Sequence, residues 1–253
     1  MNLIVEQGNT TTKVAVYHPE GQIATSHVYK KFQTSDLQPF FHQYRLTQGI
    51  LSTVIEPDRR LLSYLGDALP CFLFFDEKVR LPIDVRYQTP HTLGKDRLAA
   101  TVGAAWLQPR KDILIIDAGT AITYELLESS GIYHGGNISP GMTTRFKALH
   151  QFTGQLPLVH EDEDDNKDIP LVGYSTLTAL QAGVVRGIIY EMDGYINDLR
   201  RKYPGLLVFL TGGHSFYFAR RLKNTIFADI NLVLTGLNRI LEYNVENKES
   251  SSC

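Results

Sequence analysis

The pattern of apolar and polar positions is clearest along residues 113–127, where one strand gives way to a polar turn and a second strand. Ile113 to Ile116 are four consecutive apolar residues, a run typical of a strand covered on both faces. Asp117 ends this run, Gly119 permits a close turn, and two threonines follow before the apolar positions resume. The pattern therefore predicts a hairpin whose turn carries a carboxylate and hydroxyl groups.

A second copy of this pattern opens the chain, at residues 2–15. Superimposing Gly8 on Gly119 aligns the preceding apolar runs and three further pairs of positions: Glu6 with Asp117, Asn9 with Thr120, and Lys13 with Tyr124. Backbone N–H groups, hydroxyls and a carboxylate at such a turn suit a phosphate group and its cation. Turns of this kind also occur for structural reasons alone, but the repeat favours two similar lobes that together form a nucleotide site.

Strands and helices alternate along the rest of the chain, which predicts mixed sheets with helical cover. We expect strands at residues 22–29, 49–55, 71–75 and 206–210. We expect helices at residues 36–46 (capped by Ser35 or Asp36), after Pro57 through Leu65, and at 98–106, 142–151, 175–202 (capped by Ser175 or Thr176) and 232–243. The polar tail 246–253 is expected to fray. The apolar stripe of the 175–202 helix faces either the core or a partner subunit.

The loop at residues 87–97 is polar and interrupted by Pro90 and Gly94, so we expect it on the surface. The small-residue run that follows predicts a helix, which puts Asp96 and Arg97 at a helix N-terminus, where an anionic ligand is favoured. Taken alone, the loop favours a plainer interpretation, with Asp96 as an N-cap and Arg97 as a surface charge.

Two glycine-rich turns leave a choice between a ligand and a structural role. Gly135-Gly136 allows close approach of a ligand to the backbone or simply a tight turn. Residues 211–215, Thr-Gly-Gly-His-Ser, follow a buried strand and precede a helix, which suits an adenosine or phosphate group. His214 is interpreted as a turn residue, because none of the eight histidines has metal-ligand spacing.

Composition narrows the class of protein. The 253 residues are 43% hydrophobic and 21% charged, which is typical of a globular protein, and the net charge of -2 gives no case for binding nucleic acid or an anionic membrane. Two cysteines form no disulfide framework, no stretch approaches the roughly 20 apolar residues of a membrane span, and no signal peptide is recognisable. We expect a cytoplasmic protein. The acidic stretch 161–168 lacks the EF-hand pattern and is interpreted as a solvated loop.

These motifs together resemble the type III pantothenate kinases, in the superfamily of actin, the sugar kinases and the heat-shock ATPase chaperones. The resemblance covers nearly the whole chain and rests on residues 8–10 with Lys13, 94–97, 117–120, 135–136 with 140–141, 175–176 and 211–213. It implies an α/β, two-lobed actin-like fold with duplicated ribonuclease H-like mixed sheets flanked by helices. The N-terminal lobe, 1–111, would carry the first phosphate hairpin and the substrate loop, and the C-terminal lobe, 112–253, the second hairpin and the adenosine region.

The resemblance also implies an activity and a set of site residues. The activity is ATP-dependent phosphorylation of pantothenate to 4'-phosphopantothenate, the first step of coenzyme A biosynthesis, by a homodimer that uses Mg²⁺ and a monovalent cation, K⁺ or NH₄⁺. The residues implied for ATP are Glu6, Gln7, Gly8, Asn9, Thr10, Thr11, Thr12, Lys13 and Thr120; those for pantothenate are Tyr87, Gly94, Lys95, Asp96, Arg97 and Thr176. Asp117 matches the potassium ligand, and Asp96 matches the catalytic base, which reverses its interpretation as a cap.

Two positions depart from the family pattern, which usually has Asp where this chain has Glu6 and Glu125. The extra methylene moves each carboxylate by about one C–C bond, enough to replace a direct metal contact by a water-mediated one. Two alternatives therefore stay open. One is a related phosphotransferase or polyphosphate hydrolase that acts on another small molecule; a hydrolase would position water and need no pocket around Asp96. The other is a non-catalytic regulator, since members of this family have been described as accessory factors for gene expression.

Overall fold

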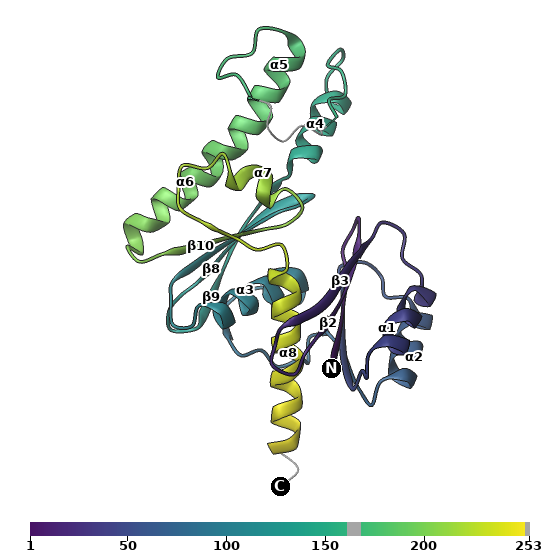
Figure 1. The fold of residues 1–253 in the computed structure, drawn as a ribbon. Coiled ribbons are helices and arrows are strands. Elements are labelled where there is room, and N and C mark those ends of the chain that lie inside the picture. Colours follow the sequence, from purple (N-terminus) through teal and green to yellow (C-terminus); the bar gives the residue numbers. More distant parts are fainter. Residues whose placement is uncertain (161–167, 251–253) are drawn as a thin grey trace. The chain divides into compact units, whose positions relative to one another are not determined.

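The computed structural model describes residues 1–160 and 168–250, and the expected acidic loop lies outside the described residues except for Asp168 (Figure 1). The chain divides into two compact units, which are described separately. The first contains residues 1–110, 130–134 and the chain from Asn231 onward, and the second contains residues 111–129 and 135–230. In the part of the chain that the structure describes, no helix is long and apolar enough to cross a membrane.

The first unit is built on a five-stranded mixed sheet with the order β3-β2-β1-β4-β5. Its strands are β1 (Asn2–Gln7), β2 (Thr12–Tyr17), β3 (Ile23–Tyr29), β4 (Gln48–Thr53) and β5 (Cys71–Phe74). Its helices are α1 (Gln38–Gln43), α2 (Arg59–Ala68), α3 (Lys95–Leu107) and α8 (Leu232–Ser250). The expected helix at 36–46 is a short 3₁₀ turn, Thr34–Leu37, followed by α1. Its N-cap is Gln33, so the expected cap at Ser35 or Asp36 is wrong; Asp36 lies inside the turn and accepts from the Gln33 N–H at 2.8 Å.

The two faces of this sheet pack against different helices. Successive side chains of a strand point to opposite faces, so the position of a residue along the strand decides which helices it meets. Leu3 and Val5 of β1 enter a core with residues of α1 and α2. Asn2 faces the other side, where its Nδ2 donates to Asn238 Oδ1 of α8 at 2.9 Å. Glu6 has the same parity as Asn2 and therefore also lies on the side of α8, against which α3 packs.

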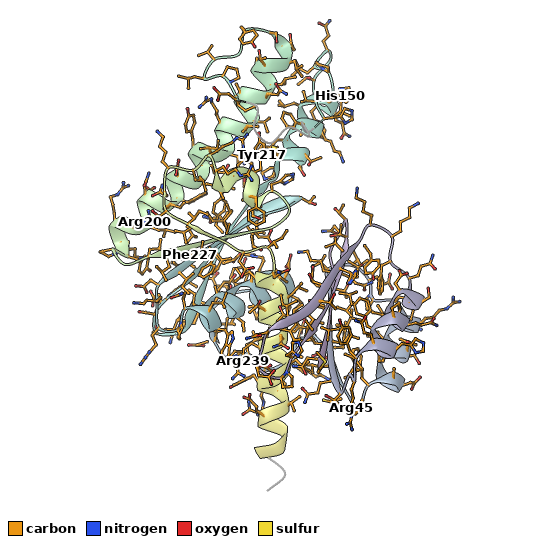
Figure 2. The ribbon with its side chains drawn as sticks, in the orientation of Figure 1. Arg45, His150, Arg200, Tyr217, Phe227 and Arg239 are labelled. Atoms are coloured by element: carbon orange, nitrogen blue, oxygen red, sulfur yellow. The ribbon has the colours of Figure 1, made fainter. Side chains whose placement is uncertain are left out.

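Helices α3 and α8 pack at unusually short range through glycines (Figure 1, yellow and blue ribbons). A Cβ atom on Gly236 would lie 2.9 Å from Gly103 N, and one on Gly103 would lie 3.0 Å from Gly236 N. Arg239 of α8, labelled in Figure 2, holds its guanidinium 4.7 Å from the ring of Trp106 at the end of α3. The assignment of all residues after 112 to the C-terminal lobe is therefore wrong for α8. The expected end of this helix at 243 is also too early, since it continues to Ser250.

The second unit contains most of a six-stranded mixed sheet with the order β11-β10-β7-β8-β9-β6. Its strands are β7 (Ile113–Ala118), β8 (Ala121–Leu127), β9 (Ile132–Pro140), β10 (Leu207–Thr211) and β11 (Phe227–Ala228). The first residues of β9 belong to the first unit, where they pair with β6 (Asp84–Val85). The helices are α4 (Met142–Gln151), α5 (Thr176–Gln181), α6 (Gly187–Lys202) and α7 (Ser215–Ala219).

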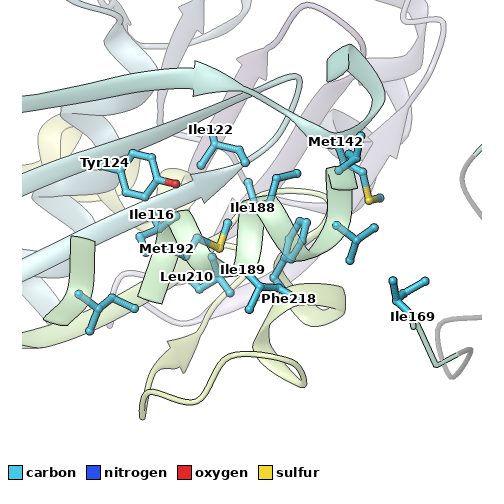
Figure 3. Close-up of a cluster of buried hydrophobic side chains, with 14 of the residues drawn as sticks. Ile116, Ile122, Tyr124, Met142, Ile169, Ile188, Ile189, Met192, Leu210 and Phe218 are labelled. Carbon is cyan, nitrogen blue, oxygen red and sulfur yellow. The ribbon is translucent and has the colours of Figure 1, made fainter. Parts of the chain in front are cut away.

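The expected helix at 175–202 is present but interrupted, because a π-helical turn at Ala182–Arg186 joins α5 to α6. Ser175, not Thr176, is the N-cap, and its Oγ accepts from the Thr178 N–H at 3.2 Å. The apolar stripe faces the core of its own unit for most of its length: Ile188 and Met192 pack with Ile116 and Leu210 of the sheet (Figure 3). At its beginning Leu177 is 48% exposed.

Gly136 serves neither of the two roles expected for the Gly135-Gly136 pair. It lies inside β9, where a Cβ atom would come within 2.6 Å of the backbone carbon of Tyr124 on β8. The absence of a side chain at Gly136 therefore lets β9 lie close to β8, its neighbouring strand.

Candidate functional site

The first hairpin, between β1 and β2, has the expected turn. Glu6 pairs with Lys13 and Gln7 with Thr12, and the Gly8 N–H donates to Thr11 O at 2.9 Å. Asn9 and Thr10 are exposed at the tip of the turn. The turn thus presents polar groups above a buried strand pair, as the sequence predicts. Gln7 Oε1 is buried and accepts no hydrogen bond within the described residues, so a ligand donor would satisfy it.

Glu6 carries a buried carboxylate in an unfavourable electrostatic environment. Lys13 Nζ lies 3.7 Å from Glu6 Oε2, and the whole Glu6 residue is only 8% exposed. Burial raises the pKa of the Glu6 carboxyl above 4.5, its ordinary value; the Lys13 ammonium lowers this pKa in part, and the Asp96 carboxylate raises it again. Glu6 and Asp96 are therefore close enough to repel each other. A cation between them would remove this repulsion.

This pKa shift predicts how stability depends on pH. Because the folded chain binds the Glu6 proton more tightly than the unfolded chain, the free energy of unfolding falls as pH rises through the window above 4.5. Glu6→Gln should therefore raise the melting temperature at pH 7, and this gain should shrink as the pH approaches 4.5.

The test is thermal unfolding of both proteins across that pH range, with Glu20→Gln, an exposed turn residue, as the control. A lower melting temperature for Glu6→Gln at pH 7 would show that the pair with Lys13 outweighs the cost of burial.

The loop at 87–97 leads into α3 in the same unit. Gly94 is the N-cap and Asp96 lies in the first helical turn, so the interpretation of Asp96 as the cap is wrong. Asp96 Oδ1 accepts from the Arg97 N–H at 2.9 Å, and a Cβ atom on Gly94 would overlap this oxygen. Glycine at position 94 therefore leaves room for the Asp96 carboxylate.

Arg97 is not the surface charge of the plainer interpretation, because it is 7% exposed. Its guanidinium carbon lies 5.7 Å from the centre of the Tyr87 ring, a cation–π distance. The neighbouring Lys95 places its Nζ 5.6 Å from the Phe75 ring. Tyr87, Lys95, Asp96 and Arg97 are thus gathered around the N-terminus of α3.

The second hairpin lies in the second unit, and its turn is one residue shorter than that of the first hairpin. Asp117 pairs with Thr123, whereas Glu6 pairs with Lys13, so the alignment of Lys13 with Tyr124 is wrong by one position. The turn is correspondingly shorter, since the Gly119 N–H donates to Ala121 O at 3.0 Å. Asp117 is the half-buried residue before the end of β7, and Thr120 is exposed at the turn.

The glycine-rich turn after β10 packs directly on this hairpin. Gly212 has φ +92°, which favours glycine, and a Cβ atom there would lie 2.7 Å from Ala118 N and closer still to Asp117 Oδ1. Thr211 is the register partner of Asp117 in the neighbouring parallel strand. Within the described residues, the buried hydroxyls of Thr211 and Ser215 have no hydrogen-bond partner, so an oxygen-binding cation or a ligand donor would satisfy them.

Thr176 is the remaining expected site residue, and it is exposed at the start of α5 in the second unit. Asp117 and Thr120 belong to the same unit, while the other expected residues belong to the first. Among the described residues, no group of three or more His, Cys, Asp or Glu side chains could hold a metal ion. The Glu6 carboxylate nonetheless fits Mg²⁺, which proteins usually bind through one or two carboxylates together with substrate phosphates.

Three features were missed from the sequence: the proximity of Glu6 to Asp96, the buried Thr211 hydroxyl without a partner within the described residues, and a partly buried polar network around Arg145. The parity of β1 could have indicated the face on which Glu6 lies. No local pattern indicates the other two, because each depends on which elements pack together.

Comparison with known proteins identifies close relatives of this chain. A family model described as type III pantothenate kinase matches residues 2–198. A Bacteroides fragilis protein named type III pantothenate kinase is 50% identical over 245 residues, which cover 96% of this chain and 98% of that protein.

Two solved structures share the fold over nearly the whole chain. A putative Baf family transcriptional activator from Campylobacter jejuni has a TM-score of 0.61 at 21% identity and covers 96% of this chain and 99% of its own. A putative 2-dehydro-3-deoxygalactonokinase from Sinorhizobium meliloti has a TM-score of 0.59 at 12% identity, with the same coverage. These matches confirm the expected α/β fold with two mixed sheets flanked by helices.

Proposed function

The chain belongs to the type III pantothenate kinase family, and from this premise we propose that it transfers the γ-phosphoryl group of ATP to the hydroxyl of pantothenate, the first step of coenzyme A biosynthesis. The observation that carries this proposal is the position of Asp96. It lies in the first turn of α3, near the buried Glu6 of the first hairpin and next to the buried Arg97. A base for an alcohol thus sits beside a hairpin suited to phosphate groups.

Asp96 is the proposed general base. Phosphoryl transfer depends mainly on positioning and charge stabilisation, so the carboxylate orients the pantothenate hydroxyl and receives its proton late. Arg97 holds the pantothenate carboxylate, and the Tyr87 ring fixes the guanidinium plane. Gly94, Lys95 and Thr176 complete the proposed pantothenate residues.

The first hairpin is the proposed site of the ATP phosphates. Backbone N–H groups and side-chain donors between Gln7 and Lys13 would donate to phosphate oxygens, the Glu6 carboxylate would face the cation, and Gln7 Oε1 would accept from a ligand donor. Thr120 is a further proposed ATP residue. Mg²⁺ held by Glu6 together with the ATP phosphates would neutralise charge on the transferred group and leave the Asp96 carboxylate for the hydroxyl. The raised pKa of Glu6 supports a cation at this place, because the cation would favour the ionised carboxylate.

A monovalent cation, K⁺ or NH₄⁺, is proposed at Asp117. The support is the buried Thr211 hydroxyl, which lacks a partner within the described residues and belongs to the register partner of Asp117. Thr211→Val should raise the K⁺ concentration needed for half-maximal activity. Titrating K⁺ at constant ionic strength tests this; equal activation of both proteins, or equal rates in Na⁺, would count against the site.

A homodimer in the cytoplasm is also proposed. Large apolar side chains are exposed before and at the start of α5: Leu171 is 69% exposed, Val172 78% and Tyr174 85%, beside Leu177. A patch of this kind marks an interaction surface, and Thr176 lies within it. Sedimentation at micromolar concentration should give a dimer, and a fully active monomer would remove this part of the proposal.

The experiment that tests the function is a coupled assay of ADP release with and without pantothenate. The proposal predicts release that depends on pantothenate and saturates with it. Sugars and other alcohols, added in place of pantothenate, test whether the chain is a related phosphotransferase with another acceptor. ADP release that is the same without pantothenate would instead favour a hydrolase, and no release would favour a non-catalytic regulator.

A further inference from the structure

A polar network inside the second unit holds the second hairpin in place. It starts at the junction of β9 and α4, which contacts the Thr120 carbonyl oxygen twice: the Gly141 N–H donates to it at 3.0 Å and Thr144 Oγ1 donates to it at 2.7 Å. A Cβ atom on Gly141 would lie 2.7 Å from the same oxygen. The position of this junction therefore determines the position of Thr120 and of the turn to which it belongs.

Arg145 of α4 fixes the junction. Its Nε donates to Pro140 O at 2.7 Å, and one of its terminal nitrogens donates to Ser139 Oγ, also at 2.7 Å. The same nitrogen lies 2.6 Å from Glu191 Oε2 of α6. The side chains of Arg145 and Glu191 are 20% and 24% exposed, so this ion pair is largely shielded from water. A shielded, charge-assisted contact of this kind is stronger and more specific in direction than a surface pair.

Tyr124 closes the network on the hairpin itself. Its hydroxyl donates to Glu191 Oε1 at 2.7 Å, and its ring lies in the core of the second unit (Figure 3). Tyr124 lies in β8, four positions after Thr120. Thr120 is linked to Arg145 through the β9–α4 junction, and Tyr124 is linked to Arg145 through Glu191.

The protonation states in the network are firmly set. Burial raises the pKa of the Tyr124 phenol, and its hydrogen bond to Glu191 raises this pKa further, so the phenol stays a donor. Burial by itself would raise the pKa of Glu191, but hydrogen bonds from Arg145 and Tyr124 lower it below its ordinary value. The network thus keeps one arrangement across the neutral range of pH.

We propose that Arg145 is a positioning residue for nucleotide binding: through Pro140, Gly141 and Thr144 it sets the position of the Thr120 turn, and Glu191 and Tyr124 hold Arg145 in place. This inference rests on the proposed function, in which the Thr120 turn contacts ATP phosphates. Arg145 itself contacts backbone and side-chain oxygens of its own unit. Its effect on ATP is therefore indirect.

The test measures ATP affinity by calorimetry, together with KM and kcat, for Arg145→Gln, Arg145→Lys, Glu191→Gln and Tyr124→Phe. Arg145→Gln should weaken ATP binding about 10-fold or more, because small displacements of a positioned group cost up to about 10²-fold. Tyr124→Phe, which keeps the ring, should weaken it about 2- to 10-fold, the equivalent of one hydrogen bond. In both variants the KM for ATP should change more than kcat. The double variant Arg145→Gln, Glu191→Gln should be no worse than Arg145→Gln alone, because the two residues act as a unit.

Two controls separate positioning from stability. Arg201→Gln removes an exposed ion pair with Asp198 on α6 and should leave ATP affinity unchanged. Ile196→Val trims the core of the same unit and should lower the melting temperature without changing ATP affinity. If Arg145→Gln fails to fold, Tyr124→Phe decides the question.

Partial recovery of ATP affinity in Arg145→Lys, relative to Arg145→Gln, would support positioning by a charged donor. ATP affinity equal to wild type in Tyr124→Phe and in every folded Arg145 variant would overturn the proposal, whatever their melting temperatures. Calorimetry does not depend on the acceptor. If the wild-type chain binds ATP without phosphorylating pantothenate, the proposed substrate fails while the comparison of ATP affinities still decides the role of Arg145.

Discussion

Replacing Asp96 by asparagine is expected to lower the turnover number of pantothenate phosphorylation by about 10²–10⁴-fold, the usual cost of losing a general base. Asparagine is nearly the same size and retains an oxygen that can accept from the Arg97 N–H, as Asp96 Oδ1 does at 2.9 Å. Gly94 remains the N-cap, so α3 loses no cap. Steady-state kinetics gives the turnover number, and calorimetry should give an ATP affinity close to that of wild type.

Arg97→Lys is the matched control for this experiment. Lysine keeps the charge but cannot reproduce a bidentate contact with a carboxylate, so this variant should mainly raise the KM for pantothenate. If Asp96→Asn keeps more than about a tenth of wild-type turnover, which is outside the range for a lost base, Asp96 is not the general base.

The second large effect is expected for Gly141→Ala, which should reduce kcat/KM for ATP by about 10²-fold. The added Cβ would lie 2.7 Å from Thr120 O and closer still to Gly119 O, and these backbone oxygens cannot rotate away as the end of a side chain could. The Thr120 turn must therefore shift, and the overlap should also cost about 1–3 kcal/mol of stability.

Gly194→Ala is the control, because a Cβ on this exposed helical glycine meets no atom within 4 Å. It should keep full activity and raise the melting temperature slightly, since alanine favours the helix by up to about 1 kcal/mol. Kinetics and thermal unfolding of both variants test the prediction. Normal kcat/KM in Gly141→Ala would mean that the Thr120 turn takes no part in binding ATP.

Local patterns were sufficient for the parts of the fold that short segments determine. The apolar run at residues 113–116 and the polar turn after it identified the second hairpin, and the same pattern identified the first. The helix that follows Gly141 was also predicted, because the glycine-rich segment before it ends at that residue. The spacing of the loop before α3 likewise placed Asp96 and Arg97 at a helix N-terminus.

Features that depend on packing between distant segments were not predicted. The C-terminal helix α8 joined the wrong lobe because its contact with α3 depends on two glycines, Gly103 and Gly236, which face each other only after folding. The offset of one residue between the hairpins was hidden because aligning glycines ignores the length of the turn. The burial of Arg97 and the network of Arg145 with Glu191 likewise depend on elements from separate parts of the chain.

The most direct test of the central claim is to follow one reaction of the wild-type protein with ATP, Mg²⁺, K⁺ and pantothenate by ³¹P NMR. The account predicts one new phosphomonoester signal, equal in amount to the ADP formed, and no such signal when pantothenate is left out. ADP that appears together with inorganic phosphate and without a phosphomonoester would contradict the account, because the chain would then hydrolyse ATP instead of transferring its phosphoryl group to pantothenate.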